Sequence, residues 1–201
     1  MEFQKVVNKR KMIRSFTDRA IPKSILDRII ENIFRGPSAG FSQGIEILIL
    51  QNQLDKALFF SQWGSKEERS KSYKKWPKME NASVILIVCS HKNAYLDRYA
   101  EKDKGWTDKD EKRWPVPYWH IDAGMAALLG LLTLVDEDLG AVFTGCDLDK
   151  TRKNFNIPDE YTPIGSILMG YPESVDLPSP SLKRGRRKID QIVHYGKWST
   201  K

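Results

Sequence analysis

The sequence is poor in the residues that build disulfide frameworks and metal centres. It has two cysteines, Cys89 and Cys146, and their spacing matches neither a disulfide framework nor a zinc site. Its three histidines, His91, His120 and His194, are isolated from one another and from other ligand side chains at useful spacing. We therefore expect no metal site and no fold that depends on disulfides.

Signatures of nucleotide binding, secretion and membrane insertion are also missing. The chain contains no G-x-G-x-x-G and no Walker sequence, so neither standard nucleotide fingerprint applies. Residues 1–7 hold no apolar signal core, which predicts a cytoplasmic protein. The apolar run inside residues 118–139 is shorter than the roughly 20 residues that a membrane span needs. We expect no membrane partner.

Positive charge is in excess. The chain has 33 Lys and Arg residues against 26 Asp and Glu residues, a net charge of +7. Such a surface attracts anions, which include nucleic acid, anionic membranes and phosphorylated small molecules. With 201 residues and 40% hydrophobic content, the chain is long enough for one substantial core. We predict a single domain over residues 1–201.

The most apolar stretch is a predicted helix that begins at Tyr118 and ends near Gly140. Between Ala123 and Val135 only Thr133 is polar, so no face of this helix suits water and protein must surround it. A chain of this size cannot easily bury such a helix alone, and we expect a second subunit to cover part of it. The small residues share one side, where another backbone could approach: Ala123, Ala126, Ala127 and Gly130.

Alternating apolar and polar segments predict the remaining elements. Strands are predicted at residues 45–50, 83–89, 141–146 and 164–170. Helices are predicted at residues 2–9, 25–33, 52–60, 94–102 and 150–155. Residues 36–44 form a loop by composition, and residues 158–162 form a turn. This pattern predicts an α/β or α+β fold in which helices cover a sheet.

One motif is typical of hydrolases, but the secondary structure predicted around it does not fit that class. Gly36-Pro37-Ser38-Ala39-Gly40 matches the G-x-S-x-G nucleophile pattern. That pattern requires a strand before the serine and a helix after it. Here a predicted helix precedes the serine and a predicted strand follows it. No persuasive Asp and His pair follows either, so we set this interpretation aside.

Two basic clusters lie at opposite ends of the chain, at Arg10–Arg14 and Lys183–Lys188. Each alone is typical of a solvated surface or tail. Termini often lie close together in compact domains, and these clusters would then offer several arginines to one phosphate. The segment Lys71–Trp76 mixes lysines with aromatic rings, so a nucleic-acid-binding module is an alternative. It ranks lower because no recognised nucleic-acid module is present.

Five motifs in a shared order resemble the nitroreductase family of FMN-dependent oxidoreductases. The family's Arg-Arg-Ser-x-Arg-x-Phe motif corresponds to residues 10–16, and its Ala-Pro-Ser-x-x-Asn-x-Gln loop to residues 36–43. The Asp-x-Gly that begins its core helix corresponds to residues 122–124. Its hydrophobic strand followed by Gly-Tyr-Pro corresponds to residues 167–172, and its closing Val-x-x-x-x-Trp to residues 193–198.

The resemblance implies an α+β fold with a sheet flanked by helices around a long buried central helix. It also implies an intertwined homodimer with FMN at the subunit interface. Four residues would hold the FMN phosphate: Arg10, Lys11, Arg184 and Arg186. Arg14 would reach the ribityl chain or the pyrimidine edge of the flavin. The isoalloxazine ring would be bordered by Pro37, Ser38 and Ala39, with Gln43 nearby. Flavin N5 would face the backbone of Thr144 and Gly145.

Two cofactor-binding positions depart from the family pattern. Met12 stands in place of a serine, which removes a hydroxyl that would bond the cofactor. Phe41 stands in place of an asparagine, so a polar contact becomes an apolar or stacking one. The binding of FMN and the range of acceptors are therefore open. The aromatic segments at residues 61–81 and 91–119 would form a lid over the flavin or pack between subunits.

The function implied by the resemblance is hydride transfer from NAD(P)H through flavin N5 to an electron-poor acceptor, a nitroaromatic or quinone, in a ping-pong cycle. FMN carries this chemistry, so we expect no catalytic side-chain nucleophile. The expected partners are a second copy of the chain and a small-molecule acceptor, with no nucleic acid. Alternatives are a flavin-fragmenting or dehalogenating enzyme of the same fold, and a non-catalytic flavin-binding protein.

Overall fold

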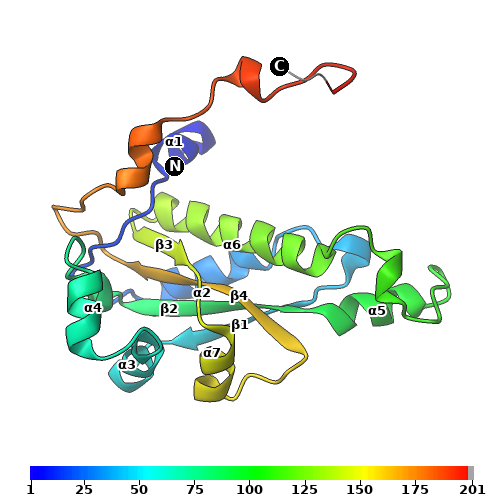
Figure 1. The fold of residues 1–201 in the computed structure, drawn as a ribbon, viewed down its shortest axis with the longest axis horizontal. Coiled ribbons are helices and arrows are strands. Elements are labelled where there is room, and N and C mark those ends of the chain that lie inside the picture. Colours follow the sequence, from blue (N-terminus) through cyan, green and yellow to red (C-terminus); the bar gives the residue numbers. More distant parts are fainter. Residues whose placement is uncertain (199–201) are drawn as a thin grey trace.

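A four-stranded antiparallel sheet forms the centre of the molecule (Figure 1). The computed structural model describes residues 1–198. The strands lie in the order β1-β2-β4-β3, with every neighbouring pair antiparallel. Their bounds are Ile45–Leu50, Val84–His91, Gly140–Thr144 and Tyr161–Gly170 for β1 to β4. The predicted α+β fold is confirmed, with all four strands present.

Two helices cover one face of the sheet. The long helix α6 (Tyr118–Asp136) lies against the strands, and α2 (Lys23–Ile33) packs beside it. Between them they form the larger hydrophobic core, because α2 turns Leu26, Ile29 and Ile33 toward α6 and the sheet. Gly130 allows this close packing, since a Cβ there would lie 2.9 Å from Ile33. This core fixes α6, and with it both of its ends, relative to the sheet.

The opposite face carries three shorter helices. These are α3 (Gln53–Ser61), α4 (Lys66–Ser72) and α7 (Leu148–Phe155). Asn52 caps α3 and Asp147 caps α7, each by accepting a backbone N–H of the first turn. The aromatic rings of α3 pack on the side chains that β2 turns to this face, which makes a second core. Strand β2 is therefore buried on both faces, as its continuous apolar sequence predicts.

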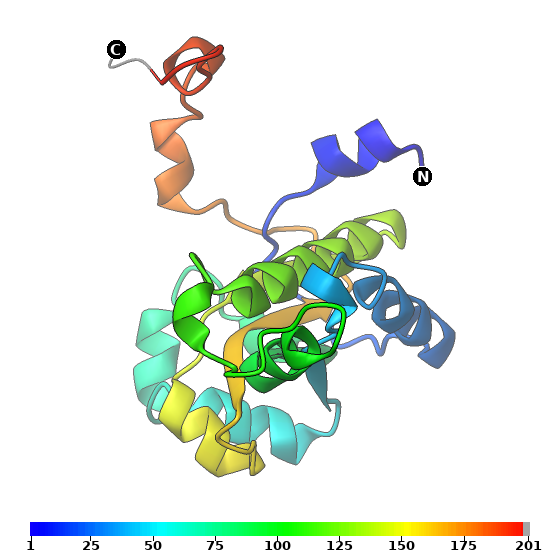
Figure 2. The same ribbon diagram turned by 90° about the vertical axis from the view of Figure 1, so that its right-hand side faces the viewer.

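The remaining segments belong to neither of the helical layers that cover the two faces of the sheet, and they lie near the ends of α6. Helix α5 (Lys92–Ala100) follows β2, and η3 (Glu111–Arg113) leads into α6. Helix α1 (Phe3–Lys9) and the tail, with η4 (Pro180–Arg184) and η5 (Ile189–Gln191), stand away from the sheet on the side of α6 (Figures 1 and 2). Two more short turns of 3₁₀-helix are η1 (Ala39–Phe41) and η2 (Met79–Asn81).

Several predicted boundaries were wrong. Helix α6 ends at Asp136, before the predicted Gly140, because Asp138 takes a left-handed conformation and Gly140 already pairs in β3. Cys146 was assigned to a strand and lies beyond β3. Residues 158–162 were assigned to a turn, but β4 begins at Tyr161 and pairs there with β2. The helix α4 was not predicted at all.

Helix α6 keeps part of its surface uncovered. It is the one helix among residues 1–198 with the length and hydropathy of a membrane span, and half of that span is buried inside the protein. Its packing against the sheet is that of a core helix. Ile121, Met125 and Leu128 remain exposed on its outer side. The chain thus covers α6 only in part, and the second subunit remains a prediction at this point.

The burial of α6 predicts a large difference between two leucines. Leu134 is 0% exposed in the larger core, whereas Leu54 on α3 is 84% exposed. We expect Leu134→Ala to lower the free energy of unfolding by about 2–5 kcal/mol through lost contacts and a residual cavity. The control Leu54→Ala should change it by less than about 0.5 kcal/mol. Urea unfolding followed by circular dichroism measures both, and equal losses would contradict the packing described.

Candidate functional site

The loop that follows α2 is fixed at the start of α6. The backbone N–H of Ala39 donates to the carboxylate of Asp122, Oδ2, at 2.8 Å. Inside the loop, the N–H of Gln43 donates to the Ser38 hydroxyl at 2.8 Å, and the N–H of Phe41 donates to the Ser38 carbonyl at the same distance. These bonds give residues 38–43 one defined shape. The loop carries all five predicted ring-contact positions from Pro37 to Gln43.

The same loop holds an unusual backbone. Gly40, Phe41 and Gln43 have φ angles of 62°, 56° and 52°. Residues with a side chain rarely adopt this left-handed region, and such strain is concentrated at functional sites. Phe41 is also 75% exposed, so its ring contributes little packing within the chain. The loop therefore presents an aromatic ring outward at a cost in backbone energy.

The aromatic segment at residues 91–119 packs against this loop. Arg98 Nε donates to the carbonyl of Gly40 at 2.9 Å. The Tyr99 ring lies so near that a Cβ on Gly40 would come within 2.6 Å of it. Trp106 and Trp114 contact Tyr99 in turn, with ring centroids 5.0 and 4.5 Å away. The segment thus lies next to the predicted flavin loop.

The first basic cluster lies at the other end of α6. The N–H of Ile13 donates to the carbonyl of Ala141 at 2.8 Å, which places this segment beside the start of β3. Arg10 is half-buried and Lys11 is exposed, so both can meet a ligand. Met12 packs against the hydrophobic cores. Its side chain is therefore used for packing at the position where the family has a serine.

Arg14 links this cluster to the base of the tail. Its backbone N–H donates to Asp176 Oδ1 at 2.8 Å, and its guanidinium lies 5.0 Å from the ring centre of Trp76. Trp76 Nε1 donates to the carbonyl of Leu177 at 2.7 Å. The two ends of the domain therefore meet at Arg14. Arg184 lies farther along the tail, where it and Arg186 are exposed and form no ion pair among residues 1–198.

Thr144 and Gly145 lie where β3 ends. Thr144 is half-buried and pairs with Ser166 of β4. Gly145 is exposed, and a Cβ built on it would meet no atom within 4 Å. The backbone here is consequently open to a ligand, as a contact with a flat ring requires.

The predicted site residues form two groups that do not meet within one chain. The loop at residues 37–43 lies at the N-terminal end of α6, and residues 10–14 lie near its C-terminal end (Figure 1). With 19 residues, α6 is about 28 Å long. The ribityl chain that joins the phosphate of FMN to its ring is much shorter. Within one chain the two groups thus lie toward opposite ends of α6.

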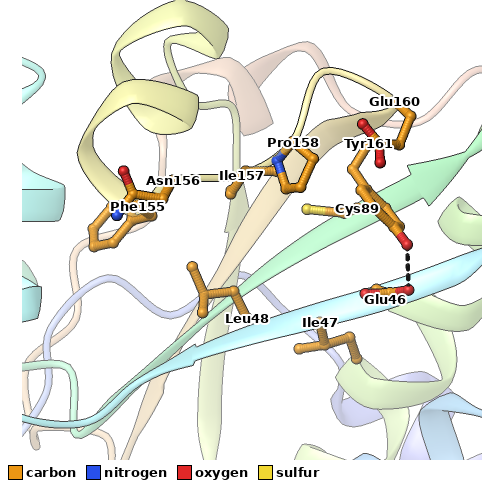
Figure 3. Close-up of a pocket in the computed structure, with 10 residues that line it drawn as sticks. All are labelled: Glu46, Ile47, Leu48, Cys89, Phe155, Asn156, Ile157, Pro158, Glu160 and Tyr161. Atoms are coloured by element: carbon orange, nitrogen blue, oxygen red, sulfur yellow. Dashed lines mark hydrogen bonds between the residues drawn. The ribbon is translucent and has the colours of Figure 1, made fainter.

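A separate cavity lies on the opposite face of the sheet (Figure 3). It has a volume of about 480 Å³ and lies between β1 and the connection from α7 to β4. The Tyr161 hydroxyl donates to Glu46 at 2.7 Å at its edge, and Glu160 adds a second carboxylate. Burial raises the pKa of Cys89 to about 12, so the thiol in its wall is neutral.

This cavity does not suit a phosphate-bearing cofactor. No Lys or Arg lines it, whereas two carboxylates do, and like charges repel. The sequence analysis did not predict this cavity, because its residues come from three separate segments without a motif. The sequence-predicted positions are thus the better candidates for anion binding. Among residues 1–198, no group of three or more His, Cys, Asp and Glu side chains is arranged to hold a metal ion.

Comparison with known proteins identifies relatives along most of the chain. A model of the nitroreductase family matches residues 7–171. A Methanothermobacter thermautotrophicus protein, provisionally named an NADH dehydrogenase/NAD(P)H nitroreductase, is 26% identical over 179 residues, which are 86% of this chain and 78% of the relative. The solved NfrA1 nitroreductase of Bacillus subtilis has a TM-score of 0.77 at 17% identity and covers 100% of this chain and 76% of its own.

A second solved structure from Bacillus subtilis, provisionally named the nitroreductase ydfN, has a TM-score of 0.74 at 19% identity. It covers 96% of this chain and 98% of its own. At these identities the structural matches show a shared fold, which is the fold described above.

The strain at Phe41 predicts that this ring can be replaced without loss of stability. Asparagine adopts the left-handed region more readily than other non-glycine residues, and the ring of Phe41 is 75% exposed. We expect Phe41→Asn to leave the free energy of unfolding unchanged or to raise it by up to about 1 kcal/mol. The β-branched control Phe41→Val should lower it. A loss above about 1 kcal/mol for Phe41→Asn, measured by urea unfolding, would contradict this account.

Proposed function

The chain belongs to the nitroreductase family and is an oxidoreductase, and we propose that it uses FMN to pass electrons from NAD(P)H to an electron-poor acceptor in the cytoplasm. The observation that carries this proposal is the pair of exposed groups at the two ends of α6, an arginine-rich segment and a strained backbone loop. When bound, FMN would supply the redox chemistry, accepting hydride at N5 and then reducing a nitroaromatic or quinone in a ping-pong cycle.

The basic groups fit the phosphate of FMN. Guanidinium groups form paired, charge-assisted hydrogen bonds with phosphate oxygens. Arg10 and Lys11 lie at the surface near the start of β3, and Arg184 and Arg186 lie on the tail that leaves the domain next to Arg14. Positive charge from Arg14 near the pyrimidine edge of the flavin would stabilise its reduced anionic form.

The strained loop fits the ring of FMN. Pro37, Ser38 and Ala39 would border the isoalloxazine system with backbone and short side chains, and Gln43 would supply polar groups. The exposed ring of Phe41 offers a stacking surface in place of the family's amide. Thr144 and Gly145 would face the ring with the open backbone at the end of β3.

A complete site requires two copies of the chain, because the two groups are separated by the length of α6. We therefore propose a homodimer in which the basic segment of one copy faces the loop of the other. The exposed side chains Ile121, Met125 and Leu128 of α6 supply an apolar surface for this contact. The tail adds further exposed apolar side chains on the same side of the molecule: Leu182, Ile189, Ile192, Tyr195 and Trp198.

Anaerobic absorbance spectra test the cofactor and its reductant. We expect protein mixed with FMN to show a bound-flavin band that bleaches with NADH or NADPH and returns when a nitroaromatic or quinone is added. The double variant Arg10→Gln with Arg186→Gln should bind FMN at least about tenfold more weakly, since charge-assisted bonds to phosphate are lost. The control is Arg35→Gln in the turn that follows α2, where Arg35 pairs with Glu31 of that helix.

Two results would contradict this proposal. Wild-type protein that binds no FMN would remove the cofactor assignment. Bound FMN that stays oxidised with both NADH and NADPH would contradict the assignment of NAD(P)H as the reductant. It would favour a non-catalytic flavin-binding protein.

Light scattering tests the homodimer. We expect a dimer for the wild type, and a shift toward monomer for Leu128→Glu, because the substitution places a charge on the exposed apolar side of α6, where Leu128 is 47% exposed. Leu54→Glu, on α3 at the other face of the sheet, should remain a dimer. A wild-type monomer at micromolar concentration would contradict the two-chain site.

A further inference from the structure

The carboxylate of Asp122 is buried behind the strained loop. Asp122 is 2% exposed and lies in the N-terminal part of α6. Its Oδ2 accepts two hydrogen bonds of 2.8 Å, one from the N–H of Ala39 and one from the Tyr95 hydroxyl. A buried carboxylate is costly unless such bonds compensate it. This arrangement therefore couples the loop, α5 and α6 through a single oxygen atom.

Tyr95 is held firmly in its place as a donor. It is 0% exposed, and burial raises the pKa of its hydroxyl above the ordinary value, with a further increase from Asp122 and an opposing effect from the Ser38 hydroxyl. The hydroxyl therefore keeps its proton across the physiological pH range. The Tyr95 ring also lies against the end of the loop, since a Cβ on Gly44 would come within 2.5 Å of it.

Arg98 supplies a second, independent connection to the loop. Its Nε donates to the carbonyl of Gly40 at 2.9 Å. Its two terminal nitrogens are held by both oxygens of Asp103, at 2.7 and 2.8 Å. The guanidinium is thus fixed in orientation before it meets the loop. The first connection reaches the loop through Asp122 of α6, supported by Tyr95 of α5, and the second comes directly from α5. Helix α5 lies with the loop at the N-terminal end of α6 (Figures 1 and 2).

The connections lie on the buried side of the loop, and Phe41 lies on its exposed side. Two left-handed residues with side chains, Phe41 and Gln43, would not persist in an unrestrained loop, since strained conformations survive only where surrounding structure over-determines them. The bonds of Ser38 inside the loop, together with the outside contacts from Asp122 and Arg98, over-determine this one. Tyr95 supports them by its bond to Asp122. They leave the outer side of the loop free.

We propose that Tyr95, Arg98 and Asp122 are positioning residues that hold residues 37–43 in the shape that receives the flavin ring, an inference that rests on the proposed function. In this proposal the three residues act through the loop, on the side away from Phe41, and not by direct contact with the cofactor. A site that is already ordered binds more tightly, because the ligand does not have to order the loop. A loop released from α5 would bind FMN more weakly and hold the ring less well aligned for reduction.

The test removes one hydroxyl. Tyr95→Phe keeps the ring and loses the buried bond to Asp122. The control Tyr161→Phe loses an exposed bond from a tyrosine hydroxyl to a carboxylate, that of Glu46 at the distant cavity. We expect Tyr95→Phe to weaken FMN binding by up to about tenfold, because FMN would then have to order the loop on binding. Its bound flavin should also be reduced more slowly by NAD(P)H at saturating FMN. Tyr161→Phe should match the wild type in both measurements.

Arg98 provides a second variant that should fold in any case, because its side chain is partly exposed. Arg98→Gln should weaken FMN binding and slow the reduction, and Arg98→Lys, which keeps a charged donor, should recover part of the loss. If Tyr95→Phe fails to fold by circular dichroism, the Arg98 pair decides the question. A purely structural role would lower thermal stability and leave the reduction rate of flavin-saturated protein unchanged.

The outcomes separate this inference from the proposed function. One outcome would overturn the positioning role alone. In that outcome the wild-type protein binds and reduces FMN, and the Tyr95→Phe or Arg98→Gln variants fold and behave as the wild type does. Wild-type protein that binds no FMN would overturn the proposed function and this inference with it. Weaker binding and slower reduction in the variants, with an unchanged Tyr161→Phe control, would support the inference.

Discussion

The apolar surface of α6 is the constraint on which the rest of the molecule depends. A helix with almost no polar residue over its central turns has to be surrounded by other hydrophobic groups. The sheet and α2 cover one side of this helix and form the larger core with it. The packing fixes the position of the loop after α2 at one end of α6 and of residues 137–139, which lead into β3, at the other. Ile121, Met125 and Leu128 on the outer side remain exposed. The folded chain therefore still has apolar surface on α6 that another molecule could bury.

The ends of α6 show two different ways of preparing a binding surface. At its C-terminal end, basic side chains such as the half-buried Arg10 and the exposed Lys11 are accessible, and no special backbone geometry is required. At its N-terminal end, a short loop is held in a strained conformation by a buried carboxylate and a fixed guanidinium. The first arrangement suits a compact charged group, which tolerates many approach angles. The second suits a rigid flat ring, which does not.

The sequence predicted elements well wherever burial produced a clear apolar pattern. Strand β1 was predicted with its observed bounds, and β2 was recognised by its continuous apolar run. Helix α4 was missed because it has no apolar stripe, although Ser65 and Glu68 form a capping box that would have revealed it. The positive φ angles at Phe41 and Gln43 could not be predicted, because neither residue type favours them and distant contacts impose them. The contacts of Asp122 depend on tertiary structure in the same way.

The separation of the two residue groups along α6 has a thermodynamic consequence. If each flavin is shared between two chains, every bound FMN stabilises the association of the chains, and association in turn raises the affinity for FMN. Cofactor content and assembly then follow a single linked equilibrium that shifts with protein concentration. Dilution of the protein would release flavin even at a constant concentration of free FMN, and flavin supplied in excess would hold the chains together at concentrations where the apoprotein dissociates.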